Sequence, residues 1–252
     1  MDRSPNESKM FDLITSWKVE WLKNKTAERG AQAKCISYKR EDEIVLKSIT
    51  KKLGNLWGVV ASSKIIKLTT KDHGIQEIIS HYPFKLYFDI DKVDFQDQDR
   101  QYLNQMLDII KTYFPEAIFA VSGSVGEVNG SYKSSYHVIL TNYLIKTKEE
   151  LACLRCLVQY LSEEHDKGFD KAVYTTNRCI KCINQSEGDG RIQSTIYNNT
   201  PGAHVITCFI NQDCNPLPDF SEYGRVEADE KLNMEIRKIH NFRQVFVSKI
   251  PV

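Results

Sequence analysis

The stretch Pro83–Asp91, which reads PFKLYFDID, carries two carboxylates at alternate positions of an otherwise apolar run. Alternate residues of a β-strand point to the same face of a sheet, so Asp89 and Asp91 are expected to stand side by side. Two like charges at that spacing repel each other, and burying them without a counter-charge is costly. Because a divalent cation with oxygen ligands offsets this cost, the stretch predicts a metal site.

A second alternating stretch, Lys133–Leu140, follows further along the chain. Lys133, Ser135 and His137 would share one face of a strand, and each can donate a hydrogen bond to a phosphate oxygen. A lone histidine in a strand is more often a core residue, but three such donors on one face favour phosphate binding. A metal-binding strand together with a phosphate-binding strand predicts a site for nucleotidyl transfer.

A third stretch, Phe169–Lys181, adds one carboxylate and two basic side chains. Asp170 is either an ordinary residue at the start of a strand or the third carboxylate of a two-metal site. Arg178 and Lys181 offer a guanidinium fork and a point charge to phosphate groups. Taken alone, this stretch does not decide between the two interpretations.

The apolar periodicity and the turn residues predict an interleaved set of helices and strands. Helices are expected over residues 10–22, 41–53, 101–114 and 148–165. Strands are expected over residues 56–68, 84–90, 117–121, 135–140, 172–174, 190–197 and 205–210. Residues 122–130 are expected to form a flexible hairpin connection that borders the site. Because tight loops join some of the strands, the predicted fold class is α/β to α+β.

The length of 252 residues suits one large domain or two closely packed subdomains. We expect a flexible N-terminus over residues 1–9, a catalytic domain of two intimately packed subdomains over 10–220, and a C-terminal segment over 221–252. That last segment is either helical or a linker to a missing region. The formal net charge of +1 argues against a protein that coats polyanions generally, although a local basic groove would not register in it.

The composition predicts an intracellular protein without a membrane segment. No run approaches the roughly 18 apolar residues of a membrane span, and the polar first residues lack a signal-peptide core. Seven cysteines, an odd number, do not form a disulfide framework in a chain of this size. Two Cys-x-x-Cys pairs are present, at Cys153/Cys156 and Cys179/Cys182, but neither has the adjacent glycine of a zinc knuckle. Structural zinc is therefore not expected.

Taken in order, the three stretches resemble the motifs of the archaeo-eukaryotic primase superfamily. Phe88–Asp91 resembles its hydrophobic-Asp-hydrophobic-Asp motif, Lys133–His137 its Ser-x-His motif with a preceding lysine, and Asp170 with Arg178 its single aspartate followed by a basic residue. Within the superfamily, the similarity is to the primase-polymerase and viral primase-helicase branch, and above all to poxvirus-type N-terminal primase domains. The resemblance spans about residues 82–191. It implies an N-terminal α/β module packed on an RRM-like sheet that carries His137 and Asp170.

The resemblance also implies a role for each site residue. The catalytic Mg²⁺ or Mn²⁺ ions would be held by Asp89, Asp91 and Asp170. The triphosphate of the incoming nucleotide would be held by Lys133, Ser135, His137 and Arg178, with Lys181 as a weaker addition. The implied activity is DNA-templated primer synthesis by a nucleotidyltransferase, a DNA primase or primase-polymerase acting in replication. The implied partners are a single-stranded DNA template, nucleoside triphosphates and a helicase domain or protein, in the cytoplasm, the nucleus or a viral replication site.

The chain departs from the family pattern after the third motif. Many relatives have a basic residue in a Ser-x-Lys context, whereas here Glu187 and Asp189 precede Arg191. Arg191 is a substitute for that residue only if the two acids do not repel the phosphates. Two alternatives to the primase also stay open: a catalytically decayed nucleotide- or DNA-binding module of a replication initiator, and a metal-dependent nuclease. The set of phosphate donors suits a triphosphate better than a scissile phosphodiester, and three carboxylates without metals would repel one another.

Overall fold

The computed structural model describes residues 22–23, 43–50, 54–65, 74–175, 177–186, 190–211 and 213–219. The helix predicted over residues 10–22 lies outside the described residues except for Leu22, which belongs to a strand. The terminal segments predicted over residues 1–9 and 221–252 lie outside them as well, as do Glu187 and Asp189.

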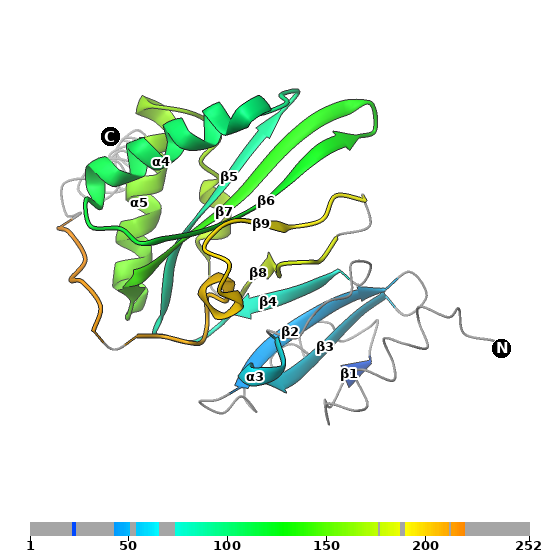
Figure 1. Ribbon diagram of the computed structural model, residues 1–252. Helices are drawn as coiled ribbons and strands as arrows, with labels where there is room; N and C mark the ends of the chain where they lie inside the picture. The colour runs from blue at the N-terminus through cyan, green and yellow to red at the C-terminus, as the bar shows by residue number, and fades with distance from the viewer. Residues whose placement is uncertain are drawn as a thin grey trace, which may run out of the picture.

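Five antiparallel strands form one sheet, here called the first sheet, in the order β1-β3-β2-β4-β8 (Figure 1). Its strands are β1 (Leu22–Lys23), β2 (Glu43–Thr50), β3 (Gly54–Ala61), β4 (Ile75–Ile79) and β8 (Arg178–Lys181). The short helix α3 (Ser62–Ile65) follows β3. The last strand is distant in sequence from the others, so the chain returns to this sheet after building most of the second one.

The helix predicted over residues 41–53 is wrong, because β2 is a strand paired with β3 from Glu43↔Ala61 onward. Ile44 packs in one hydrophobic cluster of the first sheet and Val45 packs in another on its opposite face. A strand covered on both faces is a continuous apolar run, and periodicity does not separate such a run from a buried helix.

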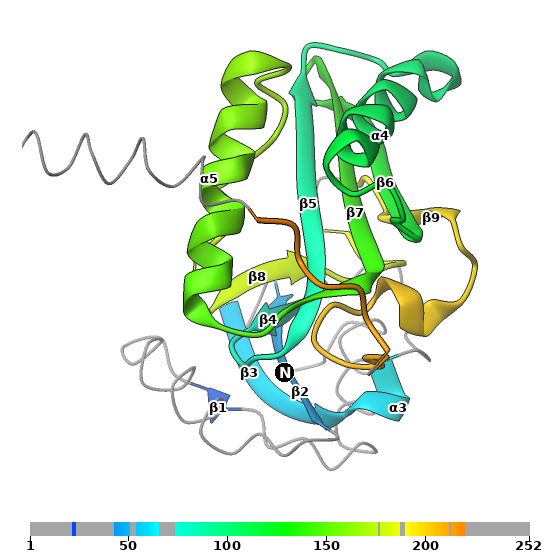
Figure 2. The same cartoon turned by 90° about the vertical axis from the view of Figure 1, so that its left-hand side faces the viewer.

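Four further antiparallel strands form the second sheet, in the order β5-β7-β6-β9. The elements of this part are β5 (Phe84–Val93), η1 (Gln98–Arg100), α4 (Gln101–Tyr113), β6 (Phe119–Val128), β7 (Ser131–Ile145), α5 (Lys148–Glu164), η2 (Lys171–Val173), β9 (Ser194–Tyr197) and η3 (Pro201–His204). Both long helices cover one face of the sheet (Figure 2). The order strand-helix-strand-strand-helix from β5 to α5 is that of ferredoxin-like units. The class is therefore α+β.

The main hydrophobic core lies between the second sheet and its two helices. Phe88 of β5 packs edge-on against Phe114 at 5.9 Å and against Phe169 at 6.1 Å between ring centroids. Leu103 of α4 and Leu154 of α5 are fully buried in the same core. No helix in the described part of the chain combines the length and the apolar composition of a membrane span.

The long elements of the second sheet confirm the sequence-based prediction, and the elements around them correct it. The strands expected over residues 84–90 and 135–140 lie within β5 and β7, and the helices expected over 101–114 and 148–165 match α4 and α5 to within one residue at the C-terminal end. Residues 122–130 are not a loop, because β6 continues to Val128 and only Asn129 and Gly130 form the turn. Both turn residues have positive φ, 53° and 85°, the conformation that tight hairpins need.

Three shorter predicted strands are wrong or too long, each for a local reason. Residues 171–173 are a 3₁₀ turn, because the carboxylate of Asp170 accepts a hydrogen bond from the Ala172 amide and caps it. Residues 205–210 form no strand, since a side chain, Glu77, takes the Ile206 and Thr207 amides that a ladder would use. In the segment 190–197, only Ser194–Tyr197 is a strand.

Candidate active site

The two predicted motifs lie on adjacent strands and pair residue by residue. In the β5–β7 ladder, Asp89 is opposite His137, Asp91 is opposite Ser135, and the next alternate position is opposite Lys133. Directly opposed residues of an antiparallel pair share a face and lie about 4.5–5.5 Å apart at Cβ. The structure therefore brings the predicted metal ligands and the predicted phosphate donors together on one face of the second sheet.

This face is the one turned away from the two long helices. Phe88 and Ile90, which alternate with the two acids along β5, are fully buried in the core beneath α4 and α5. The acids therefore point to the other side, where β8 and β4 of the first sheet run close to the second sheet (Figure 1). The site lies between the two sheets.

Two acid–base contacts join the paired strands. Lys133 Nζ lies 2.6 Å from Asp91 Oδ2 in a hydrogen-bonded ion pair, with each side chain 31% exposed. His137 Nε2 lies 3.8 Å from Asp89 Oδ1, beyond hydrogen-bonding distance, and these side chains are only 12% and 14% exposed. The inner pair of side chains is thus largely buried and loosely joined, while the outer pair is partly open to solvent and tightly joined.

Burial dominates the protonation of the inner pair. It raises the pKa of Asp89 to about 8, with the negative charges of Asp91 and Asp170 adding to the rise. Burial also lowers the pKa of His137 to about 4, and the nearby charge of Lys181 acts in the same direction. At neutral pH the carboxyl of Asp89 therefore holds a proton and the imidazole is uncharged.

Asp170, the third predicted carboxylate, is held near the site by backbone hydrogen bonds. Residues 168–170 run along the free edge of β5: the Asp91 amide donates to the Gly168 carbonyl at 2.8 Å, and the Asp170 amide donates to the Asp89 carbonyl at 3.0 Å. The carboxylate of Asp170 itself accepts the Ala172 amide at 2.8 Å. Its charge is close enough to contribute to the raised pKa of Asp89.

The three carboxylates have the chemistry of a divalent-cation site without being assembled as one. Among the described residues, no three His, Cys, Asp or Glu side chains are grouped closely enough to hold a metal ion. Oxygen donors are the ligands that Mg²⁺ and Mn²⁺ prefer, and the protonated, buried carboxyl of Asp89 lacks a close charged partner. The three carboxylates therefore fit such an ion chemically. One oxygen of Asp91 is already bound by Lys133, and one oxygen of Asp170 accepts the Ala172 amide.

Two of the predicted phosphate ligands come from the first sheet. Arg178 and Lys181 lie at the two ends of β8, opposite Ile79 and Gln76 of β4. The positive charge of Arg178 opposes the rise in the pKa of Asp89, so its guanidinium is near the acids. Its Nε is buried and has no hydrogen-bond partner among the described residues. A buried donor of this kind is available to an anionic ligand.

Arg191, whose role the sequence does not decide, lies beside β6 and β7. Its Nη1 donates to the Ser124 carbonyl at 3.0 Å, to Ser135 Oγ at 3.3 Å and to the Lys133 carbonyl at 3.4 Å. Its aliphatic stem passes over Gly126 of β6, where an added Cβ would lie 3.3 Å from Arg191 Cγ. The only sequence signal for this placement was a basic residue after a glycine, which does not specify a contact.

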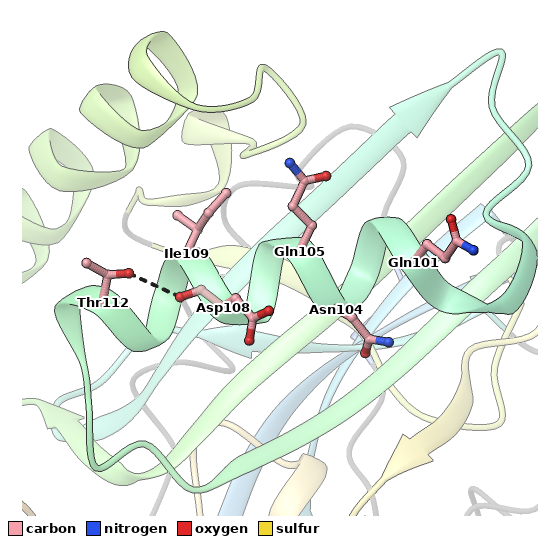
Figure 3. Close-up of a pocket in the computed structure, with 6 residues that line it drawn as sticks. All are labelled: Gln101, Asn104, Gln105, Asp108, Ile109 and Thr112. Carbon is pink, nitrogen blue, oxygen red and sulfur yellow. Dashed lines mark hydrogen bonds between the residues drawn. The ribbon is translucent and has the colours of Figure 1, made fainter.

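A separate groove follows the exposed side of α4 (Figure 3). Its lining residues are Gln101, Asn104, Gln105, Asp108, Ile109 and Thr112. Since α4 covers the face of the second sheet opposite to the acids, this groove is remote from Asp89 and Asp91. It includes no lysine, arginine or histidine, so it lacks the phosphate donors of a nucleotide site.

The fold and the site together define an α+β domain that presents paired carboxylates and phosphate donors on neighbouring strands. Residues 46–161 match the family model PPL4, described as Prim-pol 4. These residues are thus similar to a primase-polymerase family domain, which agrees with the resemblance to archaeo-eukaryotic primases inferred from the motifs. The match contains both paired motifs and ends before Asp170. A search of curated proteins returned no match to this chain.

The family match implies a general chemistry. Primase-polymerase domains normally use divalent metals, and such a domain implies DNA and nucleotides as substrates. It also indicates nucleotidyl transfer as the type of activity.

Proposed function

We propose that this chain synthesises primers on a DNA template by metal-dependent nucleotidyl transfer. The observation that carries the proposal is the β5–β7 register, in which Asp89 is opposite His137 and Asp91 is opposite Ser135. This register places candidate metal ligands and candidate triphosphate ligands within one side chain of each other. Chemistry on the α-phosphate of a bound nucleotide requires that proximity.

Asp89, Asp91 and Asp170 would hold two divalent cations, Mg²⁺ or Mn²⁺, which supply charge neutralisation and activation of the attacking hydroxyl when bound. In the proposed reaction, the 3′-oxygen of the growing strand bonds to the α-phosphorus, the bond to the bridging oxygen breaks, and pyrophosphate leaves. No protein side chain needs to act as a nucleophile. The protein contributes position and charge.

The candidate phosphate donors would hold the triphosphate from two sides. Lys133, Ser135 and His137 approach it from β7, and Arg178 and Lys181 approach it from β8 of the first sheet. The neutral imidazole of His137 can donate one N–H without repelling the neighbouring cations. We add Arg191 to this set, since it already contacts Ser135.

The two alternatives from the sequence predict different sites. A decayed binding module has no need for a carboxyl whose pKa is raised to about 8 beside two further acids. A nuclease acts on one phosphodiester and has less use for basic side chains converging from both sheets. A role in replication, a helicase partner, an intracellular location and the primase fold over residues 10–220 follow as parts of the same proposal.

The proposal is tested by incubating the purified chain with single-stranded DNA, labelled nucleoside triphosphates and Mn²⁺ or Mg²⁺. We expect metal-dependent products on unprimed template. The rate of synthesis should fall at least about a hundredfold in the Asp89→Ala/Asp91→Ala variant, because without bound metal the negative charge of the transition state is not neutralised. Asp108→Asn, a carboxylate on the exposed side of α4, is the matched control and should leave synthesis unchanged.

The other outcomes separate the alternatives. Extension only from a supplied primer would indicate a polymerase without initiation. Degradation of the DNA that disappears in the double variant would favour the nuclease. Binding of nucleotide or DNA without any synthesis would favour the decayed module and contradict the proposal.

A further inference from the structure

The loop that leads to Asp170 is organised around the carboxylate of Asp166. Asp166 Oδ1 accepts the Tyr102 hydroxyl at 2.9 Å and the Gly168 amide at 2.7 Å, and Oδ2 accepts Lys92 Nζ at 2.8 Å. These three donors come from α4, from the loop itself and from β5. One side chain thus joins the loop to both elements on which it lies.

The contacts keep this carboxylate charged. Partial burial alone would raise the pKa of Asp166, but the hydrogen bonds from Lys92, Gly168 and Tyr102 outweigh it and lower the pKa. Lys92 Nζ also lies 5.1 Å from the centroid of the Tyr102 ring, so the donors support one another. Hydrogen bonds to an ionised acceptor are stronger than neutral ones.

The loop passes so close to α4 and β5 that a side chain at Gly168 would not fit. A Cβ on Gly168 would clash with the Tyr102 hydroxyl oxygen and would lie 3.1 Å from the Asp91 carbonyl oxygen. Because the loop lies so close, the Gly168 carbonyl accepts a hydrogen bond from the Asp91 amide. Two residues later, the Asp170 amide donates to the Asp89 carbonyl. Any retreat of the loop would therefore move the third carboxylate away from the first two.

We propose that Asp166 is a positioning residue, which holds Gly168–Asp170 against β5 and so sets the place of Asp170 relative to Asp89 and Asp91. The inference rests on the proposed function insofar as these three residues are taken to be the metal ligands. Asp166 itself touches neither metal nor nucleotide in this role. Its effect on metal binding passes through the two backbone hydrogen bonds between the loop and β5.

The test uses the full chain with Asp166→Ala and three measurements. Without metal, the amide hydrogens of Asp91 and Asp170 should exchange at least tenfold faster than in the wild type. Both amides lose their hydrogen bonds when the loop at residues 168–170 moves away from β5. The Kd for Mn²⁺, measured by electron paramagnetic resonance, should rise at least tenfold. In synthesis assays kcat should fall while the KM for nucleotide stays within twofold, because the triphosphate ligands lie on β7 and β8.

Two further variants separate positioning from general destabilisation. Thr147→Ala removes the cap of α5, whose side chain accepts the Glu150 amide, and should lower stability without changing the Kd for Mn²⁺. Tyr102→Phe removes one of the three hydrogen bonds to Asp166 and should raise that Kd by less than Asp166→Ala does.

Unchanged exchange at both amides in Asp166→Ala would overturn the inference, and so would faster exchange with a wild-type Kd for Mn²⁺. A wild-type chain that binds no Mn²⁺ would overturn it together with the proposed metal site. A wild-type chain that binds Mn²⁺ but makes no product would contradict only the proposed function, since the exchange and the Kd still decide the role of Asp166.

Discussion

Two groups of buried charged residues each include a residue of β5, Lys85 in the first and Asp89 in the second, and the groups differ in how fully their polar atoms are hydrogen-bonded. On β4, the carboxylate of Glu77 accepts the Ile206 and Thr207 amides and the Thr207 hydroxyl at 2.9–3.2 Å. On β5, Lys85 Nζ donates to the carbonyl of Gly202, within η3, at 2.7 Å and to that of Val205, just after η3, at 2.8 Å. This group joins η3 and the residues that follow it to the two sheets.

The second group, a few residues along β5, is left incomplete. Asp89 Oδ1 lies 3.8 Å from the uncharged imidazole of His137, and Arg178 Nε is buried without a hydrogen-bond partner among the described residues. Buried polar atoms are normally hydrogen-bonded, and exceptions in a native structure need an explanation. The comparison therefore separates buried charges that are hydrogen-bonded within the fold from buried charges that are not, and we propose a ligand for the second group.

The largest expected difference between the two groups is in stability. Lys85→Met should lower the free energy of unfolding by about 3–5 kcal/mol, because it leaves the buried carbonyls of Gly202 and Val205 without their donor and removes the positive charge that acts on buried Glu77. Asp89→Asn should not lower it and should raise it, because at pH 7 the carboxyl of Asp89 must take up a proton on folding, whereas an amide need not. Urea denaturation at pH 7 without divalent cations measures both values.

Lys167→Met, at an exposed position, is the control for the loss of a lysine and should have little effect on stability. Equal losses of stability from Lys85→Met and Asp89→Asn would contradict the distinction between the two groups.

A smaller effect is expected in the dependence of stability on pH. The pKa of Asp89 is raised from its ordinary 3.8 to about 8, so between these values the folded state binds more protons than the unfolded state and stability falls as pH rises. His137, lowered from 6.5 to about 4, acts in the opposite direction below pH 6.5. Urea midpoints of the metal-free chain should therefore fall between pH 6.5 and 8, where Asp89 acts without this opposition.

Asp89→Asn should flatten this fall relative to the wild type, with any contribution from Glu77 common to both chains. Addition of Mg²⁺ should restore the stability of the wild type at pH 8 and leave the variant unchanged. Identical pH profiles for the two chains would show that Asp89 is not the titrating group.

The paired strands of the site could be predicted from the sequence because side-chain alternation in a strand is a local property. Asp89, Asp91, Ser135 and His137 were placed on the correct faces by spacing alone, and the ladder then brought those faces together. The strand β2 could not be recognised, because neighbours on both of its faces remove the alternation.

The remaining site residues depend on contacts between distant segments. Arg191 is placed by the path of the chain over Gly126, and Asp166 is placed by donors from α4 and β5. Neither contact leaves a periodic or local pattern in the sequence. Asp170 was named from its order after the other motifs, but its capping of η2 and its backbone bond to Asp89 required the structure.

The most direct test of the proposed active site is anomalous diffraction from crystals of the chain grown with Mn²⁺ and a non-hydrolysable nucleoside triphosphate. The proposed mechanism predicts Mn²⁺ at the carboxylates of Asp89 and Asp91, with the triphosphate beside Lys133, Ser135 and His137. Mn²⁺ sites elsewhere, or a triphosphate bound with no ion at these two carboxylates, would contradict it.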